Sequence, residues 1–291
     1  MPPSIARIGL LVFIASTLIG CREREKFSKT SASSNGATSE AYSPPPQGTG
    51  TIAGTVYIEG DPALIIDADT QKIPVDCDIA RDMYPPLFRE GAGRTLADVF
   101  VGVTGYNGKA PPKSGPVSIE AKGCAFPTRT IALSKEQSLR VKSGDGRTYV
   151  PELFGAKNKA SLVAVPGGDS IPVFHRGPGQ YVLVNSMQIF AQATVLVVDY
   201  STFDVTGING KFRIEGIPVG DAEVSAFLPA AKLNTNQKVK ISRGRTTQVD
   251  LRLKFDAAAF NALRKSSSRS EPSSNAPTPS SPATSPSAVS P

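Results

Sequence analysis

Few residues of this chain have side chains that could do chemistry. The 291 residues include three cysteines, Cys21, Cys77 and Cys124, and a single histidine, His175. Serine-type catalysis needs a histidine oriented by a carboxylate beside the nucleophile, and no Gly-x-Ser-x-Gly segment nominates that serine. His175 stands beside Arg176 in a Pro/Gly-rich segment, which is typical of a surface residue. The sequence therefore predicts a protein that is not an enzyme, and a hydrolase would have to depend on His175.

A group of acidic residues offers a second kind of site. Six aspartates lie between positions 61 and 82, and the pairs Asp67 with Asp69 and Asp76 with Asp78 could supply oxygen ligands to Ca²⁺. The spacing does not match the twelve-residue calcium loop, because the required glycine and bidentate glutamate are missing. We interpret the segment as a solvated loop and leave calcium binding open.

The elements that position these residues begin with an export signal at residues 1–20. Arg7, the apolar run from Ile8 to Ile19 and the small Gly20 have the composition of a signal peptide. The run is too short to span a hydrocarbon core of ~30 Å as a helix. Leu18-Ile19-Gly20-Cys21 resembles the lipobox of bacterial lipoproteins. That resemblance implies cleavage before Cys21, acylation of its thiol and attachment to a lipid bilayer, with an ordinary secretory signal as the alternative.

This resemblance also predicts the compartment, an extracytoplasmic position in the cell envelope. Arg22 follows the cysteine where an aspartate commonly signals inner-membrane retention, which favours the outer membrane. Two thiols in an oxidising space most often form a disulfide, so we expect one between Cys77 and Cys124. Free or metal-binding thiols are the alternative.

Net charge excludes one class of partner. Of the formal +7, the folded region 51–263 keeps only a small excess, with 24 basic and 21 acidic residues. It has no run of Lys or Arg and no Trp. Such a balance leaves no electrostatic footprint for nucleic acid.

The composition predicts a folded centre between two disordered ends. Residues 21–49 form a Ser/Thr/Gly/Pro-rich tether, and residues 266–291 form a Ser/Pro-rich tail on which O-glycosylation is conceivable. Between them, short alternating segments separated by Gly and Pro predict an all-β fold, an antiparallel β-sandwich. A short helix is expected at 256–265, with Asp256 as its N-cap. The expected strands are 51–58, 98–103, 138–142, 180–184, 193–198, 211–215, 222–227, 238–241 and 247–253.

The segment from Thr206 to Phe227 carries a family resemblance. Its Thr-Gly-Ile-Asn-Gly-Lys-Phe-Arg-Ile start and its Ile-Pro-Val-Gly continuation resemble the signature of carboxypeptidase-regulatory-like, transthyretin-type modules, and residues 51–58 resemble their first strand. The resemblance implies a β region at 203–255 that serves as a binding or spacer unit. Asn209-Gly210 predicts a hairpin turn, with Phe212 and Ile214 on one face.

Residues 97–200 resemble a cupredoxin-like domain, through Cys124-Ala-Phe-Pro127 and Pro178-Gly-Gln-Tyr-Val-Leu183, and we expect this region to span 50–202. Placed on the cupredoxin pattern, the copper-ligand positions hold Asn185 for the cysteine, Gln188 for a histidine, Ala191 for the methionine, and Tyr149 and Glu152 for the upstream histidines. A type-1 copper site needs a thiolate and two imidazoles. The resemblance therefore implies a cupredoxin-like shape with no copper and no other cofactor.

These inferences combine into one functional prediction. We expect a lipid-anchored envelope protein that acts as a binding or scaffolding module for an unidentified protein or glycan partner. One alternative is a copper-binding or redox protein that uses Cys77, Cys124, His175 or Met187. Another is an accessory subunit of an envelope complex.

Overall fold

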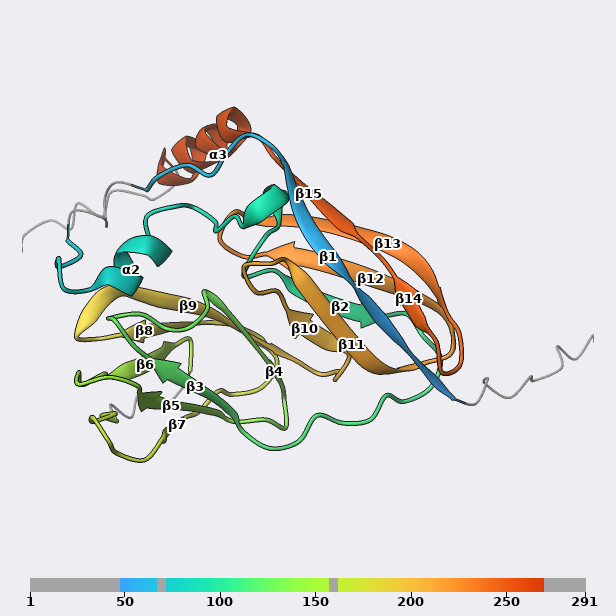
Figure 1. The fold of residues 1–291 in the computed structure, drawn as a ribbon, viewed down its shortest axis with the longest axis horizontal. Helices are drawn as coiled ribbons and strands as arrows, with labels where there is room; N and C mark the ends of the chain where they lie inside the picture. The colour runs from blue at the N-terminus through green and yellow to red at the C-terminus, as the bar shows by residue number, and fades with distance from the viewer. Residues whose placement is uncertain (1–47, 67–71, 157–161, 270–291) are drawn as a thin grey trace, which may run out of the picture. The chain divides into compact units, whose positions relative to one another are not determined.

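Fifteen β-strands dominate the part of the chain that the structure describes. The computed structural model describes residues 48–66, 72–156 and 162–269 (Figure 1). The expected signal peptide, most of the tether and nearly all of the tail lie outside these residues, as do Cys21, Asp67 and Asp69. The predicted all-β class is confirmed.

One group of strands surrounds a hydrophobic core that we call the β1 core. Its first sheet has the order β11-β1-β14, with β15 also paired to β1, and its second has the order β10-β2-β12-β13. Ile52, Val56, Val224 and Leu253 are fully buried in this core because β1, β12 and β15 alternate buried and more open positions. Val101 is also fully buried, in β2, where four of the five residues are buried. The strands are β1 (Thr49–Gly60), β2 (Phe100–Thr104), β10 (Phe203–Val205), β11 (Lys211–Pro218), β12 (Gly220–Leu228), β13 (Leu233–Ile241), β14 (Thr246–Gln248) and β15 (Leu251–Phe255).

The remaining strands surround a second core, the β8 core. Its sheets have the orders β3-β5-β7 and β4-β9-β8-β6. Leu133, Val141, Tyr149, Leu183 and Val195 are fully buried in it. The strands are β3 (Val117–Ala121), β4 (Thr130–Ser134), β5 (Leu139–Ser143), β6 (Pro151–Phe154), β7 (Ile171–Val173), β8 (Gly179–Asn185) and β9 (Gln188–Val198).

Strand pairing is mixed rather than purely antiparallel. Strand β1 pairs in parallel with β14 and β15, although these strands lie far away in the sequence (Figure 1). Parallel pairs also join β3 to β5 and β4 to β9. The remaining ladders are antiparallel, for example β8 with β9 and β12 with β13.

The two cores divide the chain differently from the expected boundary between 50–202 and 203–255. Residues 52–66 and 87–103 pack with 212–260 in the β1 core, whereas the β8 core takes residues from 73–84 and 117–197. The reason is that β1 and β2 find their hydrogen-bonding partners in β11, β12 and β15. A small cluster of four buried residues connects the cores and comprises Phe100, Ala132, Leu196 and Phe203. The rings of Phe100 and Phe203 are stacked, with their centroids 5.9 Å apart.

The turn at Asn209-Gly210 corrects one prediction. It does not close a hairpin, because β10 pairs with β2 while β11 pairs with β1. Gly210 adopts a positive φ of 66°, and its N–H donates to the carbonyl of Gly207 at 2.8 Å. The side chain of Asn209 accepts the N–H of Lys211 at 3.1 Å. Phe212 and Ile214 are both buried on one face, as expected.

Helices are few in the described residues. The sequence did not predict α2 (Asp78–Met83) or the 3₁₀ turn η1 (Ala92–Arg94). Helix α3 (Ala257–Arg269) begins as expected, with the N–H of Ala259 donating to Asp256 at 2.9 Å. It runs past the expected end at 265, so residues 266–269 are helical rather than part of the disordered tail. None of the helices described is long and apolar enough to cross a membrane.

Candidate functional site

The disulfide is the first expected feature that the structure confirms. Cys77 and Cys124 are bonded at 2.05 Å, with their Cα atoms 5.3 Å apart, and both are buried. Cys77 immediately precedes α2, and Cys124 lies in a tight turn closed by two main-chain hydrogen bonds between Lys122 and Ala125. Both central residues of this turn, Gly123 and Cys124, have positive φ, as a type I′ turn requires. The bond leaves neither sulfur free as a thiolate ligand.

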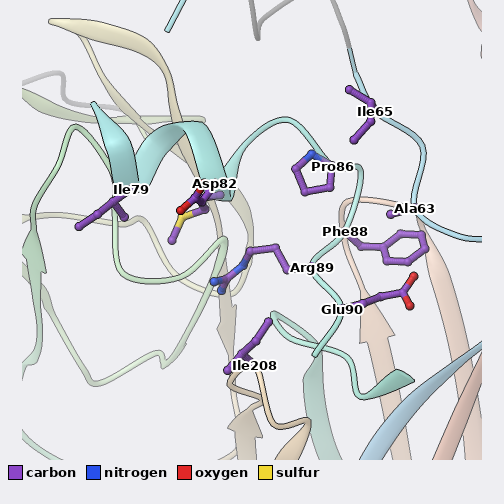
Figure 2. A pocket seen from close by; sticks show the side chains of 10 residues that line it. Ala63, Ile65, Ile79, Asp82, Pro86, Phe88, Arg89, Glu90 and Ile208 are labelled. Atoms are coloured by element: carbon purple, nitrogen blue, oxygen red, sulfur yellow. The ribbon is translucent and has the colours of Figure 1, made fainter. Parts of the chain in front are cut away.

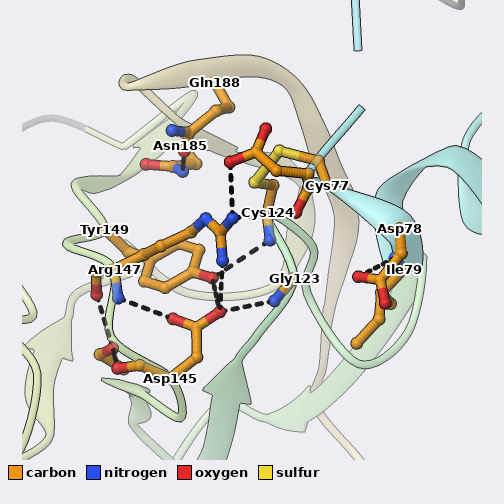
Figure 3. A network of polar contacts seen from close by, with 12 residues as sticks. Cys77, Asp78, Ile79, Gly123, Cys124, Asp145, Arg147, Tyr149, Asn185 and Gln188 are labelled. Carbon is orange, nitrogen blue, oxygen red and sulfur yellow. Dashed lines mark hydrogen bonds and ion pairs between the residues drawn. A yellow bond between two sulfur atoms is a disulfide. The ribbon is translucent and has the colours of Figure 1, made fainter. Parts of the chain in front are cut away.

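The side chains of Asn185 and Gln188, which occupy two of the copper-ligand positions of the cupredoxin pattern, are hydrogen-bonded to each other. Asn185 ends β8 and Gln188 begins β9, and the amide nitrogen of Asn185 donates to the amide oxygen of Gln188 (Figure 3). The amide oxygen of Asn185 accepts main-chain N–H groups from Val150 at 2.9 Å and from Met187 at 3.4 Å. Asn185 is fully buried. Its polar atoms are therefore satisfied by protein groups alone.

Tyr149, at a third ligand position, connects the disulfide to a neighbouring turn (Figure 3). Its hydroxyl donates to Asp145 at 3.0 Å and accepts the N–H of Cys124 at 3.2 Å. Asp145 also accepts the N–H of Gly123 at 2.7 Å and that of Arg147 at 3.0 Å. Burial raises the pKa of Tyr149 to about 12, so the phenol stays protonated at neutral pH.

The last two positions do not join this group. Glu152 pairs with Val184 in the β6–β8 ladder, one residue out of step with the Pro151–Asn185 pair. Successive side chains of a strand face opposite sides, so Glu152 lies on the other face from Asn185. Ala191 is buried in the β8 core and offers only a methyl group.

The donor set therefore does not fit type-1 copper. These positions hold two hydrogen-bonded amides and, separately bonded to Asp145, a phenol, where the cupredoxin pattern places a thiolate and imidazoles. Met187 is 61% exposed, and the described residues contain no group of three His, Cys, Asp or Glu side chains that could hold a metal.

His175 lies apart from this group and is held by main-chain partners. Its Nδ1 accepts the N–H of Gly177 at 3.2 Å, which leaves Nε2 to donate to the carbonyl of Gln137 at 2.8 Å. Neither ring nitrogen bonds a carboxylate. The arrangement gives a hydrolytic role for His175 no support.

Three described aspartates of the segment 61–82, which we interpreted as a solvated loop, serve separate local roles. Asp76 forms an ion pair with Arg147 at 2.8 Å, Asp78 accepts the N–H of Ile79, and Asp61 accepts the N–H of Ala257. Each of these carboxylates is committed to a different element. The structure does not gather them into one oxygen cage.

A cleft that the sequence did not predict lies beside α2. Its volume is about 530 Å³. Figure 2 shows that its walls come from α2, from the segment Pro86–Glu90, from Ala63 and Ile65, and from Ile208. Ile65 and Ile208 are 59% and 52% exposed, and Asp82 and Glu90 are the acidic side chains of the lining. These residues come from four separate stretches of sequence, so no local pattern could have revealed the cleft.

One wall of this cleft includes the arginine of a buried ion pair. Arg89 lines the cleft and binds Asp98 at 2.7 Å. Asp98 is 3% exposed and has a positive φ of 62°. Burial raises the pKa of Asp98, but the hydrogen bonds and charge of Arg89, the N–H of Arg129 and the hydroxyl of Thr128 outweigh it and hold the pKa below its usual value. The carboxylate is therefore ionised at neutral pH.

Comparison with known proteins does not place the chain in a family. No protein-family model matches the chain, and no curated protein matches it. Among solved structures, amicyanin from Paracoccus versutus is 13% identical, with 33% of this chain and 96% of that chain covered and a TM-score of 0.25. A copper(I) form of an amicyanin mutant is also 13% identical, with 28% and 81% covered and a TM-score of 0.24. The chain is an all-β protein.

Proposed function

We propose that this protein is a copper-free binding or scaffolding module, anchored by lipid in the bacterial cell envelope. The hydrogen-bonded pair of Asn185 and Gln188 is the observation that carries the proposal. A type-1 site at these positions would need a thiolate and an imidazole. Both cysteines of the described residues are consumed by the disulfide. The fold thus supports a role in binding rather than in electron transfer.

A copper-loading experiment tests the proposal. A soluble chain of residues 22–291, which retains every residue that the structure describes, is incubated with Cu(II) and dialysed. We expect no stoichiometric copper, no thiolate charge-transfer band and no free thiol, whereas the denatured, reduced chain serves as the control and gives two thiols. One tightly bound copper per chain would overturn the proposal and favour the copper-binding alternative.

The anchoring part of the proposal has its own test. The full chain and a Cys21→Ala variant are expressed in a Gram-negative host, labelled with palmitate and fractionated. We expect label and outer-membrane location for the full chain, and loss of both for the variant. Equal labelling of the two chains would contradict acylation at Cys21.

The cleft beside α2 is the proposed contact with a protein or glycan partner. Its exposed Ile65 and Ile208 suit apolar contact, because buried apolar area is the main favourable term in association. Ile65→Asp and Ile208→Asp should abolish crosslinking to an envelope partner in intact cells. Val75→Asp, which changes an 83%-exposed residue outside the cleft, should preserve it. Equal crosslinking of all three variants would contradict the assignment.

A further inference from the structure

A second cleft lies between helix α3 and the β1 core, and it shares no lining residue with the cleft beside α2. Its volume is about 800 Å³, within the range of about 300–1,000 Å³ that is usual for small-molecule sites. One side is α3 itself, and the others are the end of β15, the turn between β12 and β13, and the side chains of Ile66 and Leu87. We call it the α3 groove.

The floor of the α3 groove is apolar and aromatic. Phe255 packs against Phe260 of α3 at 5.8 Å between ring centroids and against Phe88 edge-to-face at 5.0 Å. Of the two leucines from the β1 core that also line the groove, Leu87 is buried and Leu233 is half-buried. Such a surface favours a hydrocarbon group over a polar one.

The rim of the groove is positively charged. Lys232, Lys254 and Arg264 line it, and none of the three forms an ion pair with a described residue. The one acidic side chain of the lining, Asp256, is committed to the N-terminus of α3, where it accepts the N–H of Ala259. The rim therefore carries an excess of cations that an anion could neutralise.

The turn between β12 and β13 positions Lys232. Lys232 has a positive φ of 54°, a conformation that favours glycine, in the turn closed by its N–H and the carbonyl of Pro229. A residue with positive φ commonly follows a type I turn in a hairpin, so this conformation belongs to the turn between β12 and β13. Here Lys232 lies on the rim of the groove.

We propose that the α3 groove binds a long-chain fatty acid, with the hydrocarbon chain on Phe255 and Phe260 and the carboxylate among Lys232, Lys254 and Arg264. Charge complementarity selects an anionic head group, and the apolar floor selects an alkyl chain. This site is independent of the copper-ligand positions, so its test can fail while the copper experiment succeeds.

A chain-length series tests the apolar part of the proposal. Monomeric fatty acids of eight to sixteen carbons are titrated calorimetrically into the chain of residues 22–291, below their micelle concentrations. We expect affinity to rise about fourfold per added CH₂ until the groove is full. Ala259→Trp should lower palmitate affinity at least tenfold, because Ala259 is an exposed residue that lines the groove. Ala258→Trp is the matched control, because Ala258 is also exposed on α3 but lies outside the lining.

Head-group variants test the charged part. Lys254→Gln should weaken palmitate binding about tenfold and leave hexadecanol binding unchanged, whereas Lys238→Gln on β13, outside the groove, should change neither. Unfolding midpoints of all variants show that each is folded. Equal palmitate affinity in Ala259→Trp and Ala258→Trp would overturn the proposal. So would binding to anionic phospholipid vesicles without any binding of monomeric palmitate.

Discussion

Arg89 holds Asp98 at two points, with Nε donating to Oδ2 and Nη2 donating to Oδ1, each at 2.7 Å. The same carboxylate accepts the hydroxyl of Thr128 at 2.7 Å and the N–H of Arg129 at 2.9 Å. Arg89 and Asp98 lie in the stretch that packs in the β1 core, whereas Thr128 and Arg129 lead into β4 of the β8 core. One buried carboxylate therefore ties the two cores together.

Asp98→Asn should lower the free energy of unfolding by about 3–5 kcal/mol, because it leaves the cationic Arg89 without its buried partner. Asparagine tolerates the positive φ at this position, so the loss reports on charge rather than on backbone strain. Urea unfolding gives the value. Glu59→Gln, which removes the exposed ion pair with Arg252, is the control and should cost less than about 1 kcal/mol. Equal losses in the two variants would contradict the role of Asp98.

Stability should also fall in acid through Asp98. The pKa of Asp98 in the folded protein lies below its usual value, which is about 3.9 in an unfolded chain. A depressed pKa contributes stability that is present above pH 3.9 and is lost as the pH falls through the folded value. Between pH 5 and pH 2.5, the free energy of unfolding should decline more steeply for the unchanged protein than for Asp98→Asn. Parallel curves would show that Asp98 does not contribute.

In alkali, Tyr84 and Tyr149 should ionise late. Burial raises the pKa of each to about 12, against about 10 for an unfolded tyrosine. The two phenols pass the unfolded pKa of about 10 before the folded pKa of about 12. The folded protein therefore loses stability through these groups as the pH rises above about 10. Absorbance titration of tyrosinate should show two groups that ionise together with unfolding. Their ionisation near pH 10 in the folded protein would be the contrary result.

Tyr149→Phe should cost about 1–3 kcal/mol, since it leaves the buried N–H of Cys124 without a partner and removes one of the hydrogen bonds to Asp145. Tyr57→Phe is a suitable control, because no hydrogen bond of the Tyr57 hydroxyl joins it to another described residue. Thermal and urea unfolding of both variants measure the difference. A neutral effect of Tyr149→Phe would mean that water replaces the lost hydroxyl.

Removal of the disulfide by Cys77→Ser with Cys124→Ser should destabilise the fold by about 4 kcal/mol in the chain-entropy account, given a sequence separation of 47. Unfolding with and without reductant checks this value. Reductant should not change the free energy of unfolding of the double variant. It should lower that of the unchanged protein to the value of the double variant. A reductant effect on the variant would point to another cause.

Much of the fold was predictable wherever alternation marked a half-buried strand. The segments at 51–58, 211–215 and 222–227 all lie within observed strands. Strand β4 escaped prediction because all five of its residues are buried, which removes the alternation. The expected strand 247–253 is interrupted, because Asp250 turns its side chain to accept the N–H of Thr55 between β14 and β15.

The candidate sites were predictable only where local spacing fixed them. Asn185 and Gln188 are three residues apart across a tight turn, so their meeting follows from the chain itself. Asp98 was expected at the start of a strand, and nothing in the sequence distinguishes it from other aspartates. Its environment depends on Arg89 and on Thr128, 30 positions away, which only the packed cores bring together.

The parallel pairing of β1 with β15 has a consequence for synthesis of the chain. The N–H of Thr55 in β1 donates to the carboxylate of Asp250, which immediately precedes β15, and the two residues are 195 positions apart. During synthesis β1 leaves the ribosome long before β15 has been made. The apolar side chains of β1 that pack beside β15 therefore stay exposed until then. Long-range pairing of this kind slows folding and leaves the nascent protein open to aggregation. The sheet around β1 can therefore be completed only after β15 has been made.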